Sequence, residues 1–138
     1  MNKENALKLA LAAEQARGAS YCPYSRFAVG AALLTEDGEI FTGANIESSS
    51  YTPTVCAERV AFFTAVHKGH RDFRAIAIVG GGRDSGLSDF CPPCGVCRQV
   101  MAEFAKADFE IILYNGTDVK IYTLAEIFPE SFTKDNLK

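Results

Sequence analysis

Two short motifs in this chain could together hold a metal ion and carry out chemistry on it. Residues 56–58 read Cys-Ala-Glu, and residues 93–97 read Pro-Cys-Gly-Val-Cys. Three thiolates can bind a tetrahedral zinc ion and leave its fourth position open for water, which is typical of a catalytic site. Glu58 could then take a proton from that water and return it to a substrate. The motifs therefore predict a zinc site with ligands Cys56, Cys94 and Cys97 and with Glu58 as general acid and base.

Two other interpretations of the cysteines have to be considered. Cys91 forms a second C-x-x-C pair with Cys94, so it could complete a purely structural zinc site, or either pair could be redox-active. A redox pair does not account for Cys56 and Glu58. The two prolines after Cys91 favour an extended backbone, which carries its thiol away from Cys94. We expect Cys91 to stay outside the metal site and Cys22 to be a small buried apolar group.

Apolar periodicity predicts the elements that position these motifs. Helices are expected near residues 9–16, from Thr52-Pro53 to about Gly69, and from Pro93 to about Phe104. Strands are expected over residues 27–34, 39–44, 75–79, 109–114 and 119–122. The turn signals Asp37-Gly38 and Asn115-Gly116 each join two consecutive strands, so the last two strands should be antiparallel. The sequence thus predicts an α/β fold, a three-layer α/β/α sandwich with a five-stranded mixed sheet in one domain, residues 1–138.

Two segments have no clear prediction of this kind. Residues 80–82 are three glycines after a predicted strand, and residues 81–86 have the spacing of a phosphate-binding loop. Leu87 stands where such a loop needs lysine, so we expect only a flexible loop there. The last ten residues show no period.

Composition and charge exclude several classes of protein. The 138 residues are 48% hydrophobic and 22% charged, and the net charge is −3, which does not suit a dedicated nucleic-acid binder. The longest uncharged stretch of the first third, residues 27–35, is far shorter than the roughly 20 residues of a membrane span. The start of the chain lacks the apolar region of a secretory signal. We expect a cytoplasmic protein without membrane or nucleic-acid partners.

The order of several motifs resembles the small, three-cysteine, homotetrameric cytidine deaminases of nucleoside salvage. Besides the zinc motifs, the resemblance rests on Tyr-Cys-Pro-Tyr-Ser at 21–25, Phe-Ala-Val-Gly-Ala-Ala-Leu at 27–33, Gly-Ala-Asn-Ile-Glu at 43–47, Cys-Ala-Glu-Arg at 56–59 and Cys-Arg-Gln-Val at 97–100. It extends from residue 21 to residue 137. The resemblance implies one zinc ion per chain, a homotetramer, and hydrolysis of cytidine and 2′-deoxycytidine to the uridine forms with release of ammonia.

The resemblance also implies roles for individual residues. It agrees with the zinc ligands and with Glu58 as proton shuttle, and it gives Arg59 hydrogen bonds to the ligand sulfurs. Such bonds would offset the excess negative charge of three thiolates on Zn²⁺. The substrate contacts that it implies are Phe27 on the pyrimidine, Asn45 and Glu47 on the ribose, Tyr51, the backbone of Ala57, and Phe132 from a neighbouring subunit.

Two departures from the family pattern and three alternative functions remain. Pro92 stands where the family often has serine, and Cys91 adds an extra thiol. The first alternative is a deaminase of another small aminopyrimidine nucleoside, such as a blasticidin-type antibiotic. The second is a nucleic-acid-editing deaminase, which the net charge and the short connection at Asn115-Gly116 oppose. The third is a zinc module without enzymatic activity.

Overall fold

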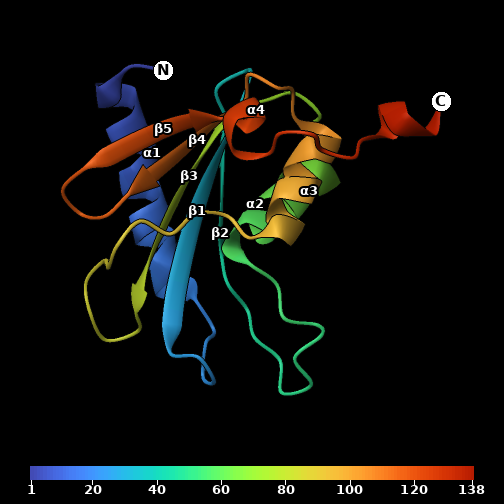
Figure 1. Cartoon of the computed structure of the whole chain (residues 1–138). Helices are drawn as coiled ribbons and strands as arrows, with labels where there is room; N and C mark the ends of the chain where they lie inside the picture. Colours follow the sequence, from blue (N-terminus) through green and yellow to red (C-terminus); the bar gives the residue numbers. More distant parts are fainter.

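A five-stranded mixed sheet forms the centre of the computed structural model, which describes residues 1–138 (Figure 1). The strands are β1 (Phe27–Thr35), β2 (Ile40–Ala44), β3 (Phe73–Gly82), β4 (Glu110–Tyr114) and β5 (Val119–Thr123), in the spatial order β2-β1-β3-β4-β5. Only β3 and β4 are parallel, and the other neighbouring pairs are antiparallel. The predicted mixed sheet with an antiparallel last pair is confirmed.

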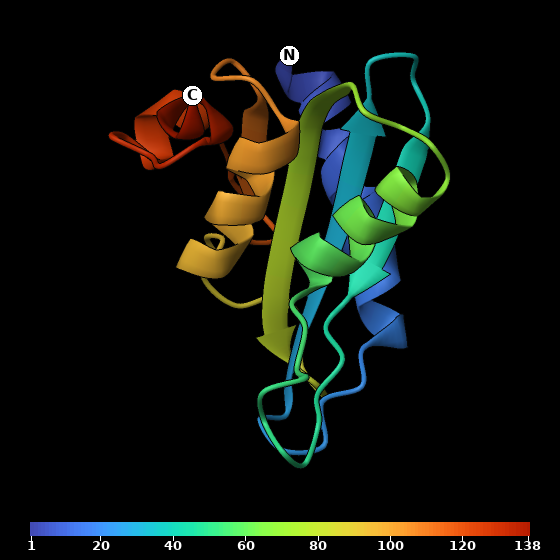
Figure 2. The ribbon, with the colours of Figure 1, turned by 90° about the vertical axis from the view of Figure 1, so that its right-hand side faces the viewer.

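Helices cover both faces of the sheet, as predicted. Helix α1 (Lys3–Ala16) lies on one face, and α2 (Ala57–His67) and α3 (Gly95–Phe104) lie side by side on the other, in front of the strands in Figure 2. The short elements are the 3-10 turns η1 (Arg17–Ala19) and η2 (Lys134–Leu137) and the one-turn helix α4 (Leu124–Ile127). None of the helices has the length and apolar character that a membrane span requires.

Alternating residues of the central strand β3 supply two separate cores. Ile76 and Ile78 pack in the cluster that includes Phe62 of α2 and Met101 of α3, whereas Val79 packs in the cluster under α1. All five side chains are almost completely buried. Burial of one such side chain stabilises the fold by roughly 1.5–3 kcal/mol. The cluster under α2 and α3 therefore holds the two helices that carry the cysteine motifs against the same face.

Gly43 in β2 sets how closely the first turn of α2 approaches the sheet. A Cβ atom at position 43 would lie 2.4 Å from the carbonyl oxygen of Ala57 and 2.7 Å from the nitrogen of Ala61. Because no real side chain tolerates such contacts, only glycine fits here. This close approach fixes the beginning of α2, which carries Cys56 and Glu58, against the edge strand.

The predicted start of the second helix is wrong. Thr52-Pro53 lies in a turn, and α2 begins at Ala57 with Cys56 as its N-cap residue. Val55 and Ile46 exchange two backbone hydrogen bonds, of 2.9 and 3.0 Å, which keep residue 55 extended and prevent an earlier helix. The third helix likewise begins at Gly95 rather than at Pro93, with Cys94 as N-cap residue.

The glycines at 80–82 belong to a strand rather than to a loop, which corrects a second expectation. β3 continues to Gly82, and Gly80, Gly81 and Gly82 pair with Val29, Ala28 and Phe27 of β1. The first hairpin also differs slightly, because four residues, 36–39, separate β1 from β2.

Candidate metal centre and active site

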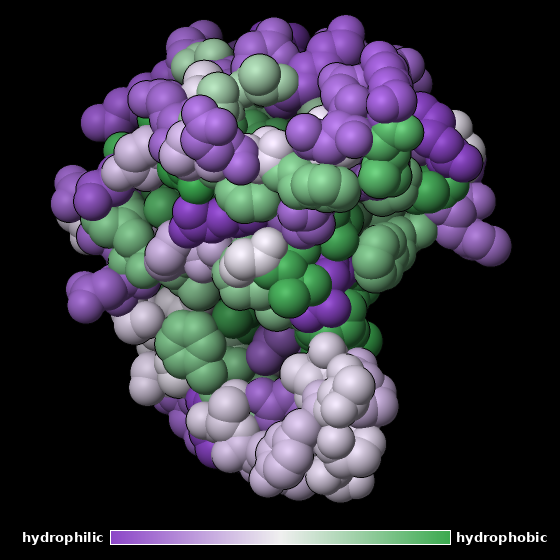
Figure 3. All heavy atoms as spheres, turned by 45° about the vertical axis from the view of Figure 1, so that its right-hand side comes forward, coloured by the Kyte–Doolittle hydropathy of each residue, from purple (hydrophilic) through white to green (hydrophobic).

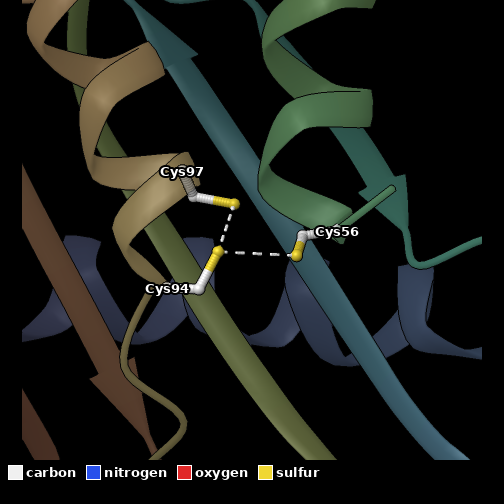
Figure 4. Close-up of side chains that lie close together, drawn as sticks. All are labelled: Cys56, Cys94 and Cys97. Atoms are coloured by element: carbon white, nitrogen blue, oxygen red, sulfur yellow. Dashed lines mark hydrogen bonds between the residues drawn. The ribbon is translucent and has the colours of Figure 1, made fainter. Parts of the chain in front are cut away.

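Three cysteine sulfurs converge where α2 and α3 begin (Figure 4). Cys56 caps α2, Cys94 caps α3, and Cys97 lies in the first turn of α3. The sulfur of Cys94 is 3.7 Å from that of Cys56 and 3.5 Å from that of Cys97, and all three lie within 4.8 Å of one another. The predicted ligand residues are thus brought together from two segments about forty residues apart in the chain.

This sulfur triangle fits a zinc ion. A tetrahedral zinc with Zn–S bonds of about 2.3 Å separates its sulfur ligands by about 3.8 Å, close to the two sulfur separations in the structure. Both helix N-termini direct free N–H groups and a partial positive charge toward the sulfurs, which favours the thiolate form. The donor set and its spacing therefore suit zinc with three protein ligands.

Glu58 is the only buried residue among the acidic and basic residues of the chain. It lies in the first turn of α2, beside the sulfurs. It is 4% exposed, and this burial raises the pKa of its carboxyl group to about 7. The negative charge of Cys56 raises it further, whereas a hydrogen bond with Cys97 acts in the opposite direction. A carboxyl group that titrates near neutrality, next to a metal site, can both accept and donate a proton.

Arg59 offsets negative charge at the sulfurs. Its Nη2 donates to Cys56 Sγ across 3.5 Å, and its Nε is buried without a partner. Burial lowers the pKa of Arg59, but the sulfurs of Cys56 and Cys97 raise it more. A hydrogen bond from Cys97, with others from Arg59 and Cys94, lowers the pKa of Cys56 to about 5, although burial opposes this shift. The hydrogen bond with Cys56, together with burial, raises the pKa of Cys97.

Cys91 does not belong to the group of converging thiols. The potential ligand group contains Cys56, Cys94 and Cys97 without it. Burial, together with the negative charges of Glu58 and Cys56, raises the pKa of the Cys91 thiol to about 11. That Cys91 is no zinc ligand stays a prediction. Cys22 is buried, as expected.

Asn45 and Glu47 are both engaged with the segment before and at the start of β1. Asn45 donates from Nδ2 to the carbonyl of Phe27 at 2.8 Å and accepts at Oδ1 from the backbone nitrogen of Val29 at 2.9 Å. The Glu47 carboxylate accepts from the backbone nitrogens of Tyr24 and Ser25, at 3.0 and 3.1 Å, and from the Ser25 hydroxyl. The hydrogen bond from that hydroxyl lowers the pKa of Glu47.

Glu47 and Tyr51, both predicted to contact the substrate, line the same cavity of about 340 Å³. It is lined by Tyr24, Ser25, Glu47, Ser48, Tyr51 and Thr54. The loop between β2 and α2 forms the pale lobe at the bottom of Figure 3, and the surface is indented above it. Tyr51 is 76% exposed and has a left-handed backbone, with φ of 62°. Such a strained, exposed aromatic residue is typical of a binding site.

The other predicted substrate contacts are dispersed. Phe27 is half-buried at the start of β1, and Ala57 is fully buried at the start of α2. Phe132 is 59% exposed on the C-terminal segment, which passes the outer side of α3 and ends away from the sheet (Figures 1 and 2). Gln99 of α3 donates to its carbonyl at 2.8 Å. The main chain at Phe132 is therefore held beside α3, while its side chain is exposed.

Another cavity lies outside the site. It has a volume of about 760 Å³ and is lined by the end of α3, by α4 and by residues between 128 and 135. The sequence also gave no role to Ser20 and Ser25, whose hydroxyls bind Asn45 Oδ1 and the Glu47 carboxylate. Nothing local distinguishes these serines from ordinary loop residues, because their partners lie 25 and 22 residues away.

Comparison with known proteins gives consistent matches. The family model of the "cytidine and deoxycytidylate deaminase zinc-binding region" matches residues 2–113. A cytidine deaminase of Halalkalibacterium halodurans is 46% identical over 138 residues, which cover 99% of this chain and 98% of that protein. A blasticidin-S deaminase of Bacillus cereus is 36% identical over 78% of each chain. The crystal structure of a cytidine deaminase from Burkholderia pseudomallei superposes with a TM-score of 0.84 and 42% identity, covering 96% of this chain and all of that one.

Proposed function

This chain belongs to the cytidine and deoxycytidylate deaminase family, and on that premise we propose that it hydrolyses cytidine and 2′-deoxycytidine to uridine and 2′-deoxyuridine. Water adds to the base, the exocyclic amino group leaves as ammonia, and the ring retains the oxygen as a carbonyl. The product supplies a nucleoside salvage route, and residues 1–138 act as one catalytic domain in the cytoplasm.

One observation carries this proposal. Glu58 is a buried carboxyl group with a pKa of about 7, adjacent to three thiols that converge from two helix N-termini. Cys56, Cys94 and Cys97 would hold one zinc ion per chain, and the bound zinc supplies the Lewis acidity that activates water for attack. A purely structural zinc site needs neither a buried carboxyl group nor a free fourth position.

Glu58 would move the proton of the reaction. Its carboxylate would accept one proton from the attacking water and pass it to the ring nitrogen. It would then move the proton of the added hydroxyl to the amino group, so that the C–N bond breaks, neutral ammonia leaves and a carbonyl remains. Burial raises the pKa of the Glu58 carboxyl group to about 7, so that it can both take up and release a proton during one turnover. Arg59 would donate to Cys56 and limit the negative charge that the three sulfurs place on the site.

The substrate would lie between the sulfurs and the cavity that contains Glu47 and Tyr51. The Glu47 carboxylate can accept hydrogen bonds from ribose hydroxyls, and the second N–H of the Asn45 amide can donate one. Phe27 would pack on the pyrimidine ring, and the backbone of Ala57 would contact the base. The cavity, of about 340 Å³, is large enough for part of a nucleoside.

We also propose that the enzyme is a homotetramer in which Phe132 completes a neighbouring subunit's site. The exposed position of Phe132, on a segment that leaves the sheet, supports this arrangement. The groove of about 760 Å³ beneath the same segment provides a surface for a second copy of the chain.

A second candidate is a deaminase of another aminopyrimidine nucleoside. The match to a blasticidin-S deaminase at 36% identity favours it over the remaining alternatives. A nucleic-acid-editing function is disfavoured by the net charge of −3 and by the four-residue connection between antiparallel β4 and β5, where editing relatives usually have a helix.

The test is a direct assay with competing substrates. Purified protein is incubated with cytidine, 2′-deoxycytidine, blasticidin S or single-stranded DNA, and deamination is followed by the loss of absorbance of the aminopyrimidine or by release of ammonia. We expect turnover of the two nucleosides that a chelator abolishes and added zinc restores. Turnover of blasticidin S alone would favour the second candidate, and no turnover of any substrate with zinc bound would overturn both.

A further inference from the structure

The ring of Phe27 lies directly over Gly80, a residue to which the proposed reaction gives no role. A Cβ atom built at position 80 would lie 3.0 Å from both Cε2 and Cζ of the Phe27 ring. It would also lie 3.0 Å from the Sγ of Cys91. The ring and the thiol therefore occupy the space that a side chain at position 80 would need.

We infer that Gly80 is a positioning residue for the base: its missing side chain lets the Phe27 ring lie against β3, where it leaves room for the pyrimidine. This inference rests on the proposed function, because it takes Phe27 as the ring that packs on the substrate.

The sheet register places Phe27 and Gly80 on one face. Val29 lies opposite Gly80, and Phe27 lies opposite Gly82, so all four residues share the face that α2 and α3 cover. The Phe27 ring leans diagonally from its own pair toward Gly80. The sulfur of Cys91, in the segment before α3, also lies 3.0 Å from a Cβ built at position 80.

The backbone of Phe27 cannot shift to relieve a contact with the ring. Its nitrogen donates to the Ser25 hydroxyl at 3.0 Å, and its carbonyl accepts from the Asn45 side chain at 2.8 Å. The preceding residue, Arg26, has a φ of 57°, a conformation that is costly for a non-glycine residue. An added methyl group at position 80 would therefore press on the ring and on the Cys91 sulfur, which would have to give way by a few tenths of an ångström. Because Phe27 is 38% exposed, its ring has room to move toward solvent, and we expect it to move into the space that the base would occupy.

Gly82 provides a matched control on the same strand and the same face. A Cβ atom there would meet only the Ser85 side chain, at 3.1 and 3.5 Å, and no atom of Phe27. Ser85 lies in an exposed turn and can rotate away. Gly80→Ala and Gly82→Ala therefore make the same chemical change in one glycine run, but only the first reaches the ring.

The experiment compares these two variants in the zinc-loaded enzyme. We expect Gly80→Ala to raise KM for cytidine and Kd for the product uridine by about five- to tenfold, a range typical of a disturbed aromatic contact. The kcat should change less than KM, and zinc content should stay at the wild-type value. Gly82→Ala should stay within about twofold in KM, Kd and kcat. Equal effects of the two variants, or an unchanged Kd in Gly80→Ala, would overturn the inference.

A double-mutant cycle shows whether Gly80 acts through Phe27. In a Phe27→Ala background, Gly80→Ala should weaken uridine binding no further, because the ring that the methyl group displaces is gone. Additive losses would mean that position 80 acts independently of the ring. A crystal structure of Gly80→Ala should show the ring displaced outward relative to the wild type. This readout stays valid even if cytidine is not turned over, an outcome that would refute the proposed function but not the placement of the ring.

A folding defect has its own control. If Gly80→Ala is insoluble, Gly80→Ala/Cys91→Ala removes the contact with the sulfur and keeps the contact with the ring, so the same comparison can be made. Insolubility of both variants would also overturn the inference, because contact with a half-exposed ring should not prevent folding.

Discussion

The side-chain nitrogen of Asn45 donates a hydrogen bond to the main-chain carbonyl of Phe27 across 2.8 Å. The oxygen of the same amide accepts from the backbone nitrogen of Val29 and from the hydroxyl of Ser20. One side chain at the end of β2 thereby fixes the first residues of β1, including the ring assigned to the pyrimidine. Asn45 thus combines a structural role with the proposed contact to ribose.

The first prediction is that Asn45→Ala lowers both stability and activity. The substitution leaves the carbonyl of Phe27 and the nitrogen of Val29 without their side-chain partner, which costs about 1–3 kcal/mol where these groups are buried. We expect a lower midpoint of urea unfolding and a higher KM for cytidine. A variant with wild-type stability and only a raised KM would show that Asn45 serves the ribose alone.

Asn45→Asp separates the two roles of this side chain further. It keeps acceptors for Val29 and Ser20 but replaces the donor to Phe27 by a carboxylate oxygen. We expect it to lose stability as well, since two oxygens then face each other. Stability equal to the wild type would show that the bond to Phe27 contributes little.

The second prediction concerns Glu58. Glu58→Gln and Glu58→Ala should retain zinc and the fold but lose turnover of cytidine by a factor of ~10²–10⁴, because only the proton path is removed. Zinc content by elemental analysis and thermal unfolding provide the controls. Near wild-type turnover in either variant would refute the assigned proton transfer.

The third prediction separates the zinc ligands from the other thiols. Cys56→Ser, Cys94→Ser and Cys97→Ser should each lose zinc, because their sulfurs form the converging group. Cys91→Ser should keep one zinc ion per chain. The Cys91 thiol has a pKa of about 11, and it lies beside Gly80, outside the group of converging sulfurs. Loss of metal from Cys91→Ser, measured by elemental analysis, would mean that the ligand set is assigned wrongly.

The cysteine motifs were predictable because their geometry is local. Cys94 and Cys97 are three residues apart at the start of a helix, so their thiols face the same side whatever surrounds them. The order of strands with alternating apolar residues likewise predicted the sheet and its two covered faces. Local spacing therefore placed Cys94 and Cys97 together, whereas Cys56 joins them only because α2 and α3 pack on the same face of the sheet.

The wrong predictions concern segments whose conformation is set by pairing with another part of the chain. The signal at Thr52-Pro53 is a good helix start, but the pairing of Val55 with Ile46 keeps the chain extended until Cys56. The glycines at 80–82 look like a loop, but pairing with β1 makes them a strand. Within the last sixteen residues, the capping boxes Thr123/Glu126 and Thr133/Asn136 were a usable local signal that apolar periodicity missed.

The fourth prediction is that the active site is shared between chains. Sedimentation should show a tetramer at micromolar concentration. Phe132→Ala should lower kcat/KM by on the order of tenfold through loss of an aromatic contact with the substrate, and Glu58→Ala should be nearly inactive. The exposed ring of Phe132, on a C-terminal segment that runs outside α3, is the reason to expect a partner's site there.

Co-assembly of the two variants tests this arrangement directly. If Phe132 acts on a neighbour, random mixing of equal amounts restores a wild-type Glu58 beneath a wild-type Phe132 in about one site in four. The activity of the mixed tetramers should then exceed that of either parent. If Phe132 acts within its own chain, no site contains both wild-type residues, and the mixture should show the mean of its parents. Such a mean, or a fully active monomer, would refute the shared site.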